Sequence, residues 1–355
     1  MTMISSDNKT DHYASGLPEG WASRPADLGD VEAMTALRRH HEERARGWPS
    51  VSAEQIAVAV DDSGKVHREH LVLSDPDGQL RAWCEVHDRA AGRVVVTLVV
   101  DPDLADAIAD RVAAALLTYA RQTAITMASD HGLVQTELDS DAFSDDTRQA
   151  RWLAQAGLGR IRTWWHMVRP VQRSEAADGA LPAPNERVSL RRVAPGYDGM
   201  PDIDDLRTVH DVLEEAFADH FNSHEESFDG FVARLREDPN HRWDDWWIAE
   251  IIDGDVAAKP AGALVGAVIP GSDDADDPSQ AGTYVEYIGV LRSARGRGVA
   301  TSLIHAVVAD AARRGRHRVS LEVDADSPTG AQGLYTSLGF TTKYTTETWL
   351  TYLEC

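Results

Sequence analysis

Several features that would assign a protein to a common class are missing from this sequence. Only two cysteines, Cys84 and Cys355, occur in 355 residues, so neither a disulfide framework nor a cysteine zinc site is expected. No apolar run approaches the roughly 18 residues that a membrane span needs. The polar first twenty residues lack the basic and apolar segments of a secretory signal. We therefore expect a cytoplasmic protein without a membrane partner.

Positive charge is also scarce. Lysine and arginine number 35 against 58 acidic residues, a net charge of −23, which argues against nucleic acid as a partner because phosphate binding needs a basic footprint. The arginines are unevenly spread, however. Seven of them, with Asp310 as the single acidic residue, lie between Leu291 and Arg318. Such a local basic patch on an acidic protein suits a small polyanionic ligand better than a polymer.

The length of the chain predicts two domains. Residues 1–28 lack periodicity and are expected to be a flexible lead-in, and the composition of residues 171–186 predicts a linker. Between them, residues 29–170 read as two helices, three strands, and then helix, strand, helix, strand. Residues 187–355 show the same order after an initial strand. The predicted fold class is α/β (α+β), with two similar domains.

Short segments of the two halves also resemble each other. Val134–Asp141 echoes Val319–Asp326, and Trp152–Leu158 echoes Leu334–Phe340, so the chain reads as two copies of one fold. The copies differ at one turn: where the second half has arginines and glycines, the first has Asp101–Ala107 with three aspartates. We expect the first copy to lack the anion site of the second.

That turn lies within residues 283–301, which read as an apolar strand, an arginine–glycine turn and the start of a helix. A helix N-terminus attracts anions, and Gly296 and Gly298 let the backbone approach a phosphate. The spacing excludes a Walker A loop, which needs a following lysine. A dinucleotide fingerprint fits poorly, because Thr301 occupies its third glycine position. A dinucleotide-binding module remains an alternative.

A third class of phosphate-binding turn fits better. Arg295–Ala300 has the pattern Arg-x-x-Gly-x-Ala after a strand that ends in Gly289-Val290, and a second signature runs from Asp324 to Phe340. At these residues the chain resembles the GNAT superfamily of acyl-CoA-dependent N-acyltransferases, over residues 187–353. Tandem GNAT proteins have a similar length and layout. The resemblance implies two tandem GNAT-like domains, each with a mixed, largely antiparallel sheet flanked by helices, of which residues 187–355 would be catalytic and residues 29–170 degenerate.

The resemblance also implies a role for individual residues. It assigns binding of acetyl-CoA, the acyl donor, to Ile288, Gly289, Val290, Arg295, Gly296, Arg297, Gly298, Val299, Ala300, Thr301 and Ser327. The N–H groups of the turn would hold the pyrophosphate, the strand would pair with the pantetheine arm, and Val290 N–H would polarise the thioester carbonyl. At one of these positions the chain departs from the family pattern, since many members have asparagine where this chain has Ser327.

Two residues would carry the chemistry. Tyr335 would protonate the departing thiolate, and Glu286 would accept the proton of the amine. His220, Phe221 and His224 are candidate contacts of the acceptor, and the acidic Asp273–Asp277 is either a solvated loop or an attractor of a cationic acceptor. The expected reaction is acetyl transfer to a small-molecule amine by direct attack, without a metal. The alternative is a non-catalytic acyl-CoA-binding or regulatory protein. Either a monomer with an internal pseudo-dimer or a homodimer is compatible.

Overall fold

The computed structural model describes residues 16–61, 67–90, 92–197, 199–218, 226–253, 257–269, 281–327 and 330–355. The chain divides into two compact units. Unit 1 comprises Met1–Trp164 and Tyr344–Cys355, and unit 2 comprises Trp165–Lys343. None of the helices in the described ranges combines the length and the apolar character needed to cross a bilayer. The two units are taken separately below.

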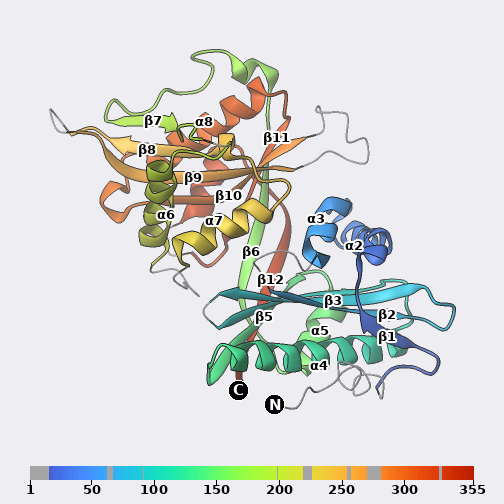
Figure 1. Ribbon diagram of the computed structural model, residues 1–355. Helices are drawn as coiled ribbons and strands as arrows, with labels where there is room; N and C mark the ends of the chain where they lie inside the picture. Colours follow the sequence, from blue (N-terminus) through green and yellow to red (C-terminus); the bar gives the residue numbers. More distant parts are fainter. Residues whose placement is uncertain are drawn as a thin grey trace. The chain divides into compact units, whose positions relative to one another are not determined.

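In the described residues, the two copies contain the same α-helices and strands in the same order, and differ in their short 3-10 helices (Figure 1). The first copy comprises β1 (Ala22–Pro25), η1 (Leu28–Asp30), α2 (Val31–Arg46), α3 (Ala53–Val60), β2 (Arg68–Ser74), β3 (Leu80–Ala90), β4 (Arg93–Val100), α4 (Asp106–Asp130), β5 (Gln135–Phe143), α5 (Thr147–Gln155) and β6 (Gly159–Pro170). The second comprises, after η2 (Arg173–Ala176), β7 (Val188–Arg192), α6 (Ile203–Phe217), α7 (Phe228–Glu237), η3 (Trp243–Asp245), β8 (Trp247–Ile251), β9 (Lys259–Ile269), β10 (Gly282–Val290), η5 (Arg292–Ala294), α8 (Val299–Arg313), β11 (Arg318–Asp324), α9 (Ala331–Ser337) and β12 (Thr341–Glu354).

Each unit contains a mixed sheet. In unit 1 the strand order is β1-β2-β3-β4-β5-β12, and only the β4–β5 pair is parallel. In unit 2 the order β11-β10-β9-β8-β7 likewise has a single parallel pair, β10–β11. The predicted fold class, two similar domains with largely antiparallel sheets flanked by helices, is confirmed.

The last strand of each copy leaves the unit that holds the rest of that copy. Strand β12 ends the second copy, yet its residues Thr346–Glu354 pair antiparallel with β5 of unit 1. Strand β6 ends the first copy, yet its residues 165–170 belong to unit 2, where the strand neighbours β11. The predicted domains are residues 29–170 and 187–355. The compact units differ from them because residues 165–170 of β6 belong to unit 2, and Tyr344–Cys355, which include most of β12, belong to unit 1.

Helices cover both faces of each sheet (Figure 1). In unit 1, α4 and α5 bury one core, and α2 and α3 bury a second one around Trp83. In unit 2, α8 and α9 cover a core that includes Val285 and Val299, whereas α6 and α7 cover a core around Trp246. Each unit is thus a helix–sheet–helix sandwich, the layer pattern expected when both faces of a sheet are apolar.

Two glycines bring helices of unit 2 unusually close to the sheet. A Cβ on Gly262 of β9 would lie 2.7 Å from Cγ1 of Val299, at the start of α8. A Cβ on Gly289 of β10 would lie 2.9 Å from Cβ of Ala216, in α6. Any larger residue would force these helices outward. The two glycines therefore let the start of α8 pack closely on β9 and the end of α6 pack closely on β10, at neighbouring positions of the paired strands.

Two expectations about irregular segments are corrected. The lead-in, expected to be flexible over residues 1–28, is wrong for Ala22–Pro25, which form β1 and pair with β2. Residues 1–15 lie outside the described residues. The predicted linker at 171–186 is packed on unit 2: Val171 N–H donates to His317 O at 2.8 Å, and Leu181 contacts the core beneath α8. Neither segment has periodically spaced apolar residues, which are the signal from which packed structure is predicted in a sequence.

Candidate functional site

The site predicted from the sequence lies where the parallel strands of unit 2 separate. Strands β10 and β11 pair only from Gly282–Val285 to Arg318–Leu321, although β10 continues to Val290 and β11 to Asp324. On its other edge β10 remains paired with β9 as far as Val290. Beyond Val285, in a stretch of β10 that is fully described, one edge of the strand has no strand partner.

The direction of the backbone groups follows from one hydrogen bond. Leu291 N–H donates to Ala261 O of β9 at 2.9 Å. Because alternate residues of an antiparallel strand direct their N–H and C=O groups to the same side, Gly289 also faces β9, whereas Ile288 and Val290 face the opposite edge. The N–H of Val290 and both backbone groups of Ile288 therefore point into the gap between β10 and β11.

Helix α8 begins beside the end of this strand. Gly296 and Gly298 have φ values of 77° and 82°, in the left-handed region that favours glycine, and a Cβ on either would meet no heavy atom within 4 Å. Gly298 is the N-cap and provides no side-chain cap. The first intrahelical bond is Ser302 N–H to Gly298 O, at 3.0 Å. The N–H groups of the first three helical residues, Val299–Thr301, thus have no partner within the helix.

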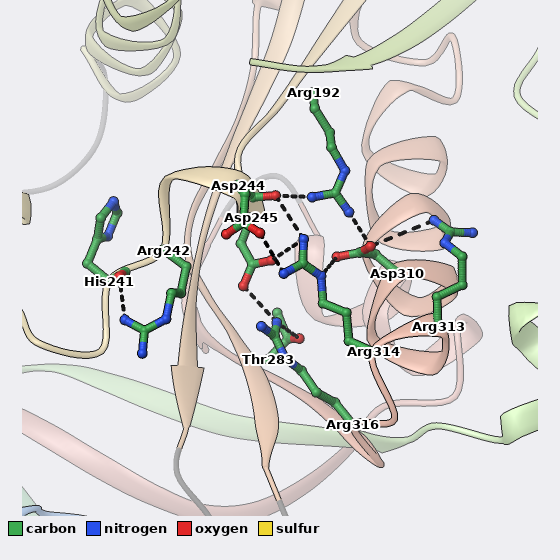
Figure 2. A network of polar contacts seen from close by, with 10 residues as sticks. All are labelled: Arg192, His241, Arg242, Asp244, Asp245, Thr283, Asp310, Arg313, Arg314 and Arg316. Carbon is green, nitrogen blue, oxygen red and sulfur yellow. Dashed lines mark hydrogen bonds and ion pairs between the residues drawn. The ribbon is translucent and has the colours of Figure 1, made fainter. Parts of the chain in front are cut away.

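The seven arginines after Leu291 do not form one basic surface, and the expectation of a single patch is corrected. Figure 2 shows Arg314 and Arg316 directed toward aspartates. Arg316 donates to Asp245 Oδ2 at 2.7 Å and Arg314 to Asp310 Oδ2 at 2.8 Å, inside a network that ties α8 to η3. Near the glycines, Arg295 and Arg297 are exposed, and Arg297 Nη1 lies 3.3 Å from Asp253. At the start of α8, the positive charge available to a ligand is therefore that of Arg295 and Arg297.

Tyr335 lies on α9 in the core beneath α8. It is 6% exposed, its ring meets Phe340 edge-on at 5.8 Å, and Ile288 and Val290 pack against the same core. Burial raises the pKa of the Tyr335 hydroxyl to about 12, because a phenolate would lose its hydration. The hydroxyl stays protonated at neutral pH and is a hydrogen-bond donor.

Glu286 sits at an irregularity of β10. The β9–β10 register shifts between Val285 and Tyr287, and such a bulge redirects side chains. The carboxylate is 17% exposed and Oε2 lies 3.3 Å from Nδ1 of His241, a residue that sequence reasoning missed. His241 precedes η3 and contacts the α6–α7 core, opposite the core that holds Tyr335. The two predicted catalytic residues thus approach the gap from opposite faces of the sheet.

The remaining predicted residues contribute less. Ser327 is half-buried in the turn between β11 and α9, and its N–H donates to Asp324 O at 3.2 Å. The candidate acceptor contacts and the acidic loop lie outside the described residues; they are His220, Phe221, His224 and Asp273–Asp277. The predicted cofactor-binding residues from Ile288 to Thr301 are therefore grouped around the end of β10 and the start of α8. Of the residues predicted to meet the acceptor amine, only Glu286 lies in the described part of the chain.

The corresponding turn of unit 1 is closed by its own side chains. Asp101 Oδ1 accepts from Asp103 N–H at 2.8 Å, and Arg148 donates to Pro102 O at 2.9 Å. A cavity of ≈ 230 Å³ remains at the end of β4, lined among others by His41 and Arg148. His40, Asp101 and Asp103 could provide metal ligands within 4.8 Å of one another, but Asp101 already pairs with Arg81 at 2.9 Å. Carboxylates occupy the place of an anion site.

Comparisons with known proteins agree with this architecture. The model of the acetyltransferase (GNAT) family matches residues 209–340, which include β10, α8 and Tyr335. A comparison with curated proteins finds no match. The match to the GNAT family therefore lies in the second half of the chain.

Solved structures resemble the whole chain. A GCN5-related N-acetyltransferase from Sphaerobacter thermophilus has a TM-score of 0.71 at 23% identity, with 96% of this chain and 98% of that chain covered. A tandem GNAT protein from the clavulanic acid biosynthesis pathway has a TM-score of 0.69 at 16% identity, with 94% and 98% covered. The N-myristoyltransferase of Saccharomyces cerevisiae, with bound myristoyl-CoA, scores 0.55 at 11% identity, with 95% and 80% covered. At these identities the likeness shows the fold.

Proposed function

We propose that this protein transfers an acetyl group from acetyl-CoA to the amine of a small molecule. One observation carries the proposal: an unpaired strand edge at Ile288 and Val290 leads directly into an uncapped helix start at Val299. An extended pantetheine arm can pair with such an edge as an added strand would. The pyrophosphate that follows it needs several N–H donors and positive charge, which the helix start provides.

Different groups around the turn would bind different parts of acetyl-CoA. The N–H groups of Val299, Ala300 and Thr301, together with the positive-φ turn at Gly296 and Gly298, would hold the pyrophosphate. Arg295 and Arg297 would add charge, and Arg297 would have to exchange its contact with Asp253. The N–H of Val290, which points into the gap, would donate to the thioester carbonyl and stabilise the negative charge that develops on its oxygen.

Glu286 and Tyr335 would handle the protons. Glu286 accepts the proton of the amine while the amine nitrogen attacks the thioester carbon, and the carbon–sulfur bond then breaks. The Tyr335 hydroxyl donates a hydrogen bond to the departing sulfur. Its pKa of about 12 lies above the roughly 8.5 of an ordinary thiol, so complete proton transfer from tyrosine is unfavourable and water supplies the last proton. Tyr335, which is expected from the sequence to protonate the thiolate, would therefore act as a hydrogen-bond donor to the departing sulfur.

The acceptor side favours an amine that carries positive charge. Asp238 and Glu286 both contact His241, the first through its carbonyl and the second through its carboxylate. Burial raises the pKa of the Asp238 carboxyl, and the negative charge of Glu286 raises it further. The acidic net charge of −23 would also attract a cation over longer range. A monomer suffices for this reaction, since both predicted catalytic residues belong to unit 2.

The binding step can be tested with two variants of one helix. Gly298→Glu places a carboxylate at the start of α8 and should abolish acetyl-CoA binding in calorimetry, through charge repulsion and steric block. Gly315→Glu is the matched control, because Gly315 has a φ of 72° and open surroundings at the other end of α8. Equal binding by both variants would contradict the proposal that the start of α8 holds the pyrophosphate.

The reaction itself is tested by mixing the protein with acetyl-CoA and a panel of amines. Release of free CoA thiol and transfer of the acetyl group to one amine are expected. The second candidate function, acyl-CoA binding without catalysis, is favoured if acetyl-CoA binds tightly but no amine releases thiol.

A further inference from the structure

Three side chains of unit 2 form a chain of hydrogen bonds that ends on the carboxylate of Glu286. Trp246 Nε1–H donates to His241 Nε2 at 2.9 Å, and Nδ1 of the same ring lies 3.3 Å from Glu286 Oε2. Trp246 is fully buried, and the His241 side chain is 2% exposed. Water therefore has little access to either nitrogen, and the two protein partners decide where the ring carries its proton.

The indole nitrogen fixes the tautomer of His241. An indole N–H can only donate, so Nε2 must present its lone pair to Trp246. In the neutral ring the single proton is then on Nδ1, where it faces the carboxylate of Glu286. The opposite tautomer would set two N–H donors against each other and a lone pair against a carboxylate. It would lose both hydrogen bonds in a buried place, where unpaired polar groups are costly.

The surroundings hold the ring in this orientation. The ring centroid of His241 lies 4.5 Å from that of Trp243 and 5.4 Å from that of Trp246, and both pairs of rings meet edge-on. His241 N–H donates to Asp238 O at 3.0 Å, and a backbone bridge joins His241 to Ala267 of β9. Backbone and ring are both anchored, so the direction of Nδ1 is set by the fold and not by a freely turning side chain.

Two charged residues near Glu286, Arg234 and Asp238, could compete for one partner of the hydrogen bond between His241 Nδ1–H and the Glu286 carboxylate, but both are engaged elsewhere. Arg234 packs over the ring of Tyr287, the residue after Glu286, with Cζ 5.6 Å from the ring centroid, but its guanidinium binds both oxygens of Glu226, at 3.0 and 2.7 Å. Asp238, the other nearby carboxyl, accepts from Asn240 N–H at 2.9 Å. Neither provides Glu286 with a hydrogen bond comparable to that from Nδ1.

From this geometry we propose that His241 is a positioning residue for Glu286. Its Nδ1–H holds Oε2, which fixes the rotamer of a glutamate at a β-bulge and leaves Oε1 to meet the amine. Trp246 acts one step further out, by keeping the proton of His241 on Nδ1. The inference rests on the proposed function, in which Glu286 is the base. It adds that the base is oriented by a neutral histidine whose tautomer is set by a tryptophan.

The tautomer can be observed without any substrate. A two-bond ¹H–¹⁵N correlation spectrum of the wild-type protein should show one histidine in the neutral Nδ1–H form, and its signals should vanish in His241→Asn. Trp246→Phe removes the indole donor and should broaden or shift these signals. A ring of His241 in the Nε2–H form would overturn the proposal.

Two substitutions of His241 separate positioning from simple packing. The amide nitrogen of an asparagine side chain reaches about the place of Nδ1, whereas that of glutamine reaches about the place of Nε2. His241→Asn should therefore keep kcat within about threefold of wild type, and His241→Gln should lower it about tenfold or more, the effect of losing one hydrogen bond to a charged group. The affinity for acetyl-CoA should be equal in both, which also shows that both are folded. Equal kcat in the two variants would overturn the role.

A double-mutant cycle identifies the group through which His241 acts. In a Glu286→Gln background, adding His241→Gln should lower kcat no further, because the oriented carboxylate is already gone. Additive losses would mean that His241 acts elsewhere and would contradict the proposal. If the wild-type protein releases no thiol with any amine, the proposed function fails, whereas the nitrogen spectrum still decides whether His241 donates to Glu286.

Discussion

Arg316 donates to Asp245 at 2.7 Å, and the two side chains are only 8% and 2% exposed. The same guanidinium nitrogen donates to Thr283 of β10 at 2.8 Å. This buried pair therefore connects the end of α8, the η3 turn and the strand that carries Glu286 (Figure 2). Removing one partner of such a pair leaves a charge buried without compensation, which is more costly than the pair itself is stabilising.

We expect Arg316→Ala to lower the free energy of unfolding by about 3 kcal/mol, the usual cost of an orphaned buried charge. Arg313→Ala is the control from the same stretch. Arg313 is 47% exposed and 3.8 Å from Asp310, so its loss should change stability by less than about 1 kcal/mol. Urea unfolding of both variants measures the difference. Similar midpoints would show that the Asp245 charge is stabilised by its other neighbours.

Gly289→Ala should destabilise the protein because its Cβ has no room. It would lie 2.9 Å from Ala216 Cβ and 3.0 Å from Leu213 Cδ2, both on α6. Overpacking of this kind costs about 1–3 kcal/mol. Gly333→Ala, in an open position on α9, is expected to be neutral or to stabilise by up to about 1 kcal/mol, because alanine is the better helix former. Thermal unfolding should give a lower midpoint for Gly289→Ala than for wild type, and an equal or higher midpoint for Gly333→Ala.

The sequence predicted those elements that carry local signals. The helices Thr147–Gln155 and Phe228–Glu237 carry such signals, because Asp146 and Ser227 cap them and a proline follows the second. The strand Ala22–Pro25 has no apolar alternation, and only pairing with β2 defines it. The pairing of β12 with β5 joins segments some two hundred residues apart in sequence, and no local pattern encodes that choice.

The residues of the candidate site also divide into those with a local sequence signal and those that only the folded structure brings together. The glycine turn and Glu286 could be proposed from the sequence because they lie within one short segment that resembles a known motif. His241 could not, since it lies 45 residues from Glu286 in sequence and its role depends on which ring nitrogen faces Trp246. Counting arginines was misleading for a related reason. Arg314 and Arg316 look like part of a ligand site until their aspartate partners on η3 are known.

His41 should make unit 1 sensitive to mild acid. Burial lowers its pKa to about 4, because a charged imidazole would lose hydration. Below pH 6.5 the unfolded chain gains a proton that the folded chain does not take up until about pH 4. Stability should therefore fall as the pH falls across this window, by up to about 1.4 kcal/mol per pH unit. His41→Gln should flatten this part of the urea midpoint against pH, and an unchanged slope would exclude His41 as the cause.

Tyr335→Phe should lower kcat while leaving the affinity for acetyl-CoA nearly unchanged. The phenyl ring keeps the packing on Phe340, and only the hydroxyl that would donate to the departing sulfur is lost. General acid or hydrogen-bond catalysis by one group contributes roughly 10²-fold or more, so a fall of about that size is expected. Tyr352→Phe, at an exposed position of β12, is the control and should be neutral. An unaffected kcat in the Tyr335 variant would remove its catalytic role.

The raised pKa of Tyr335 gives a second, independent signature in alkali. Between pH 10 and about 12 the unfolded chain loses the phenolic proton and the folded chain retains it. The folded state then binds more protons than the unfolded state, so the free energy of unfolding should fall as the pH rises through this window, by up to about 1.4 kcal/mol per unit. Tyr335→Phe cannot lose this proton and should lack that part of the decline. Urea unfolding of the two proteins at pH 9 to 11 measures the difference, and parallel curves would mean that the hydroxyl is not held in a desolvated site.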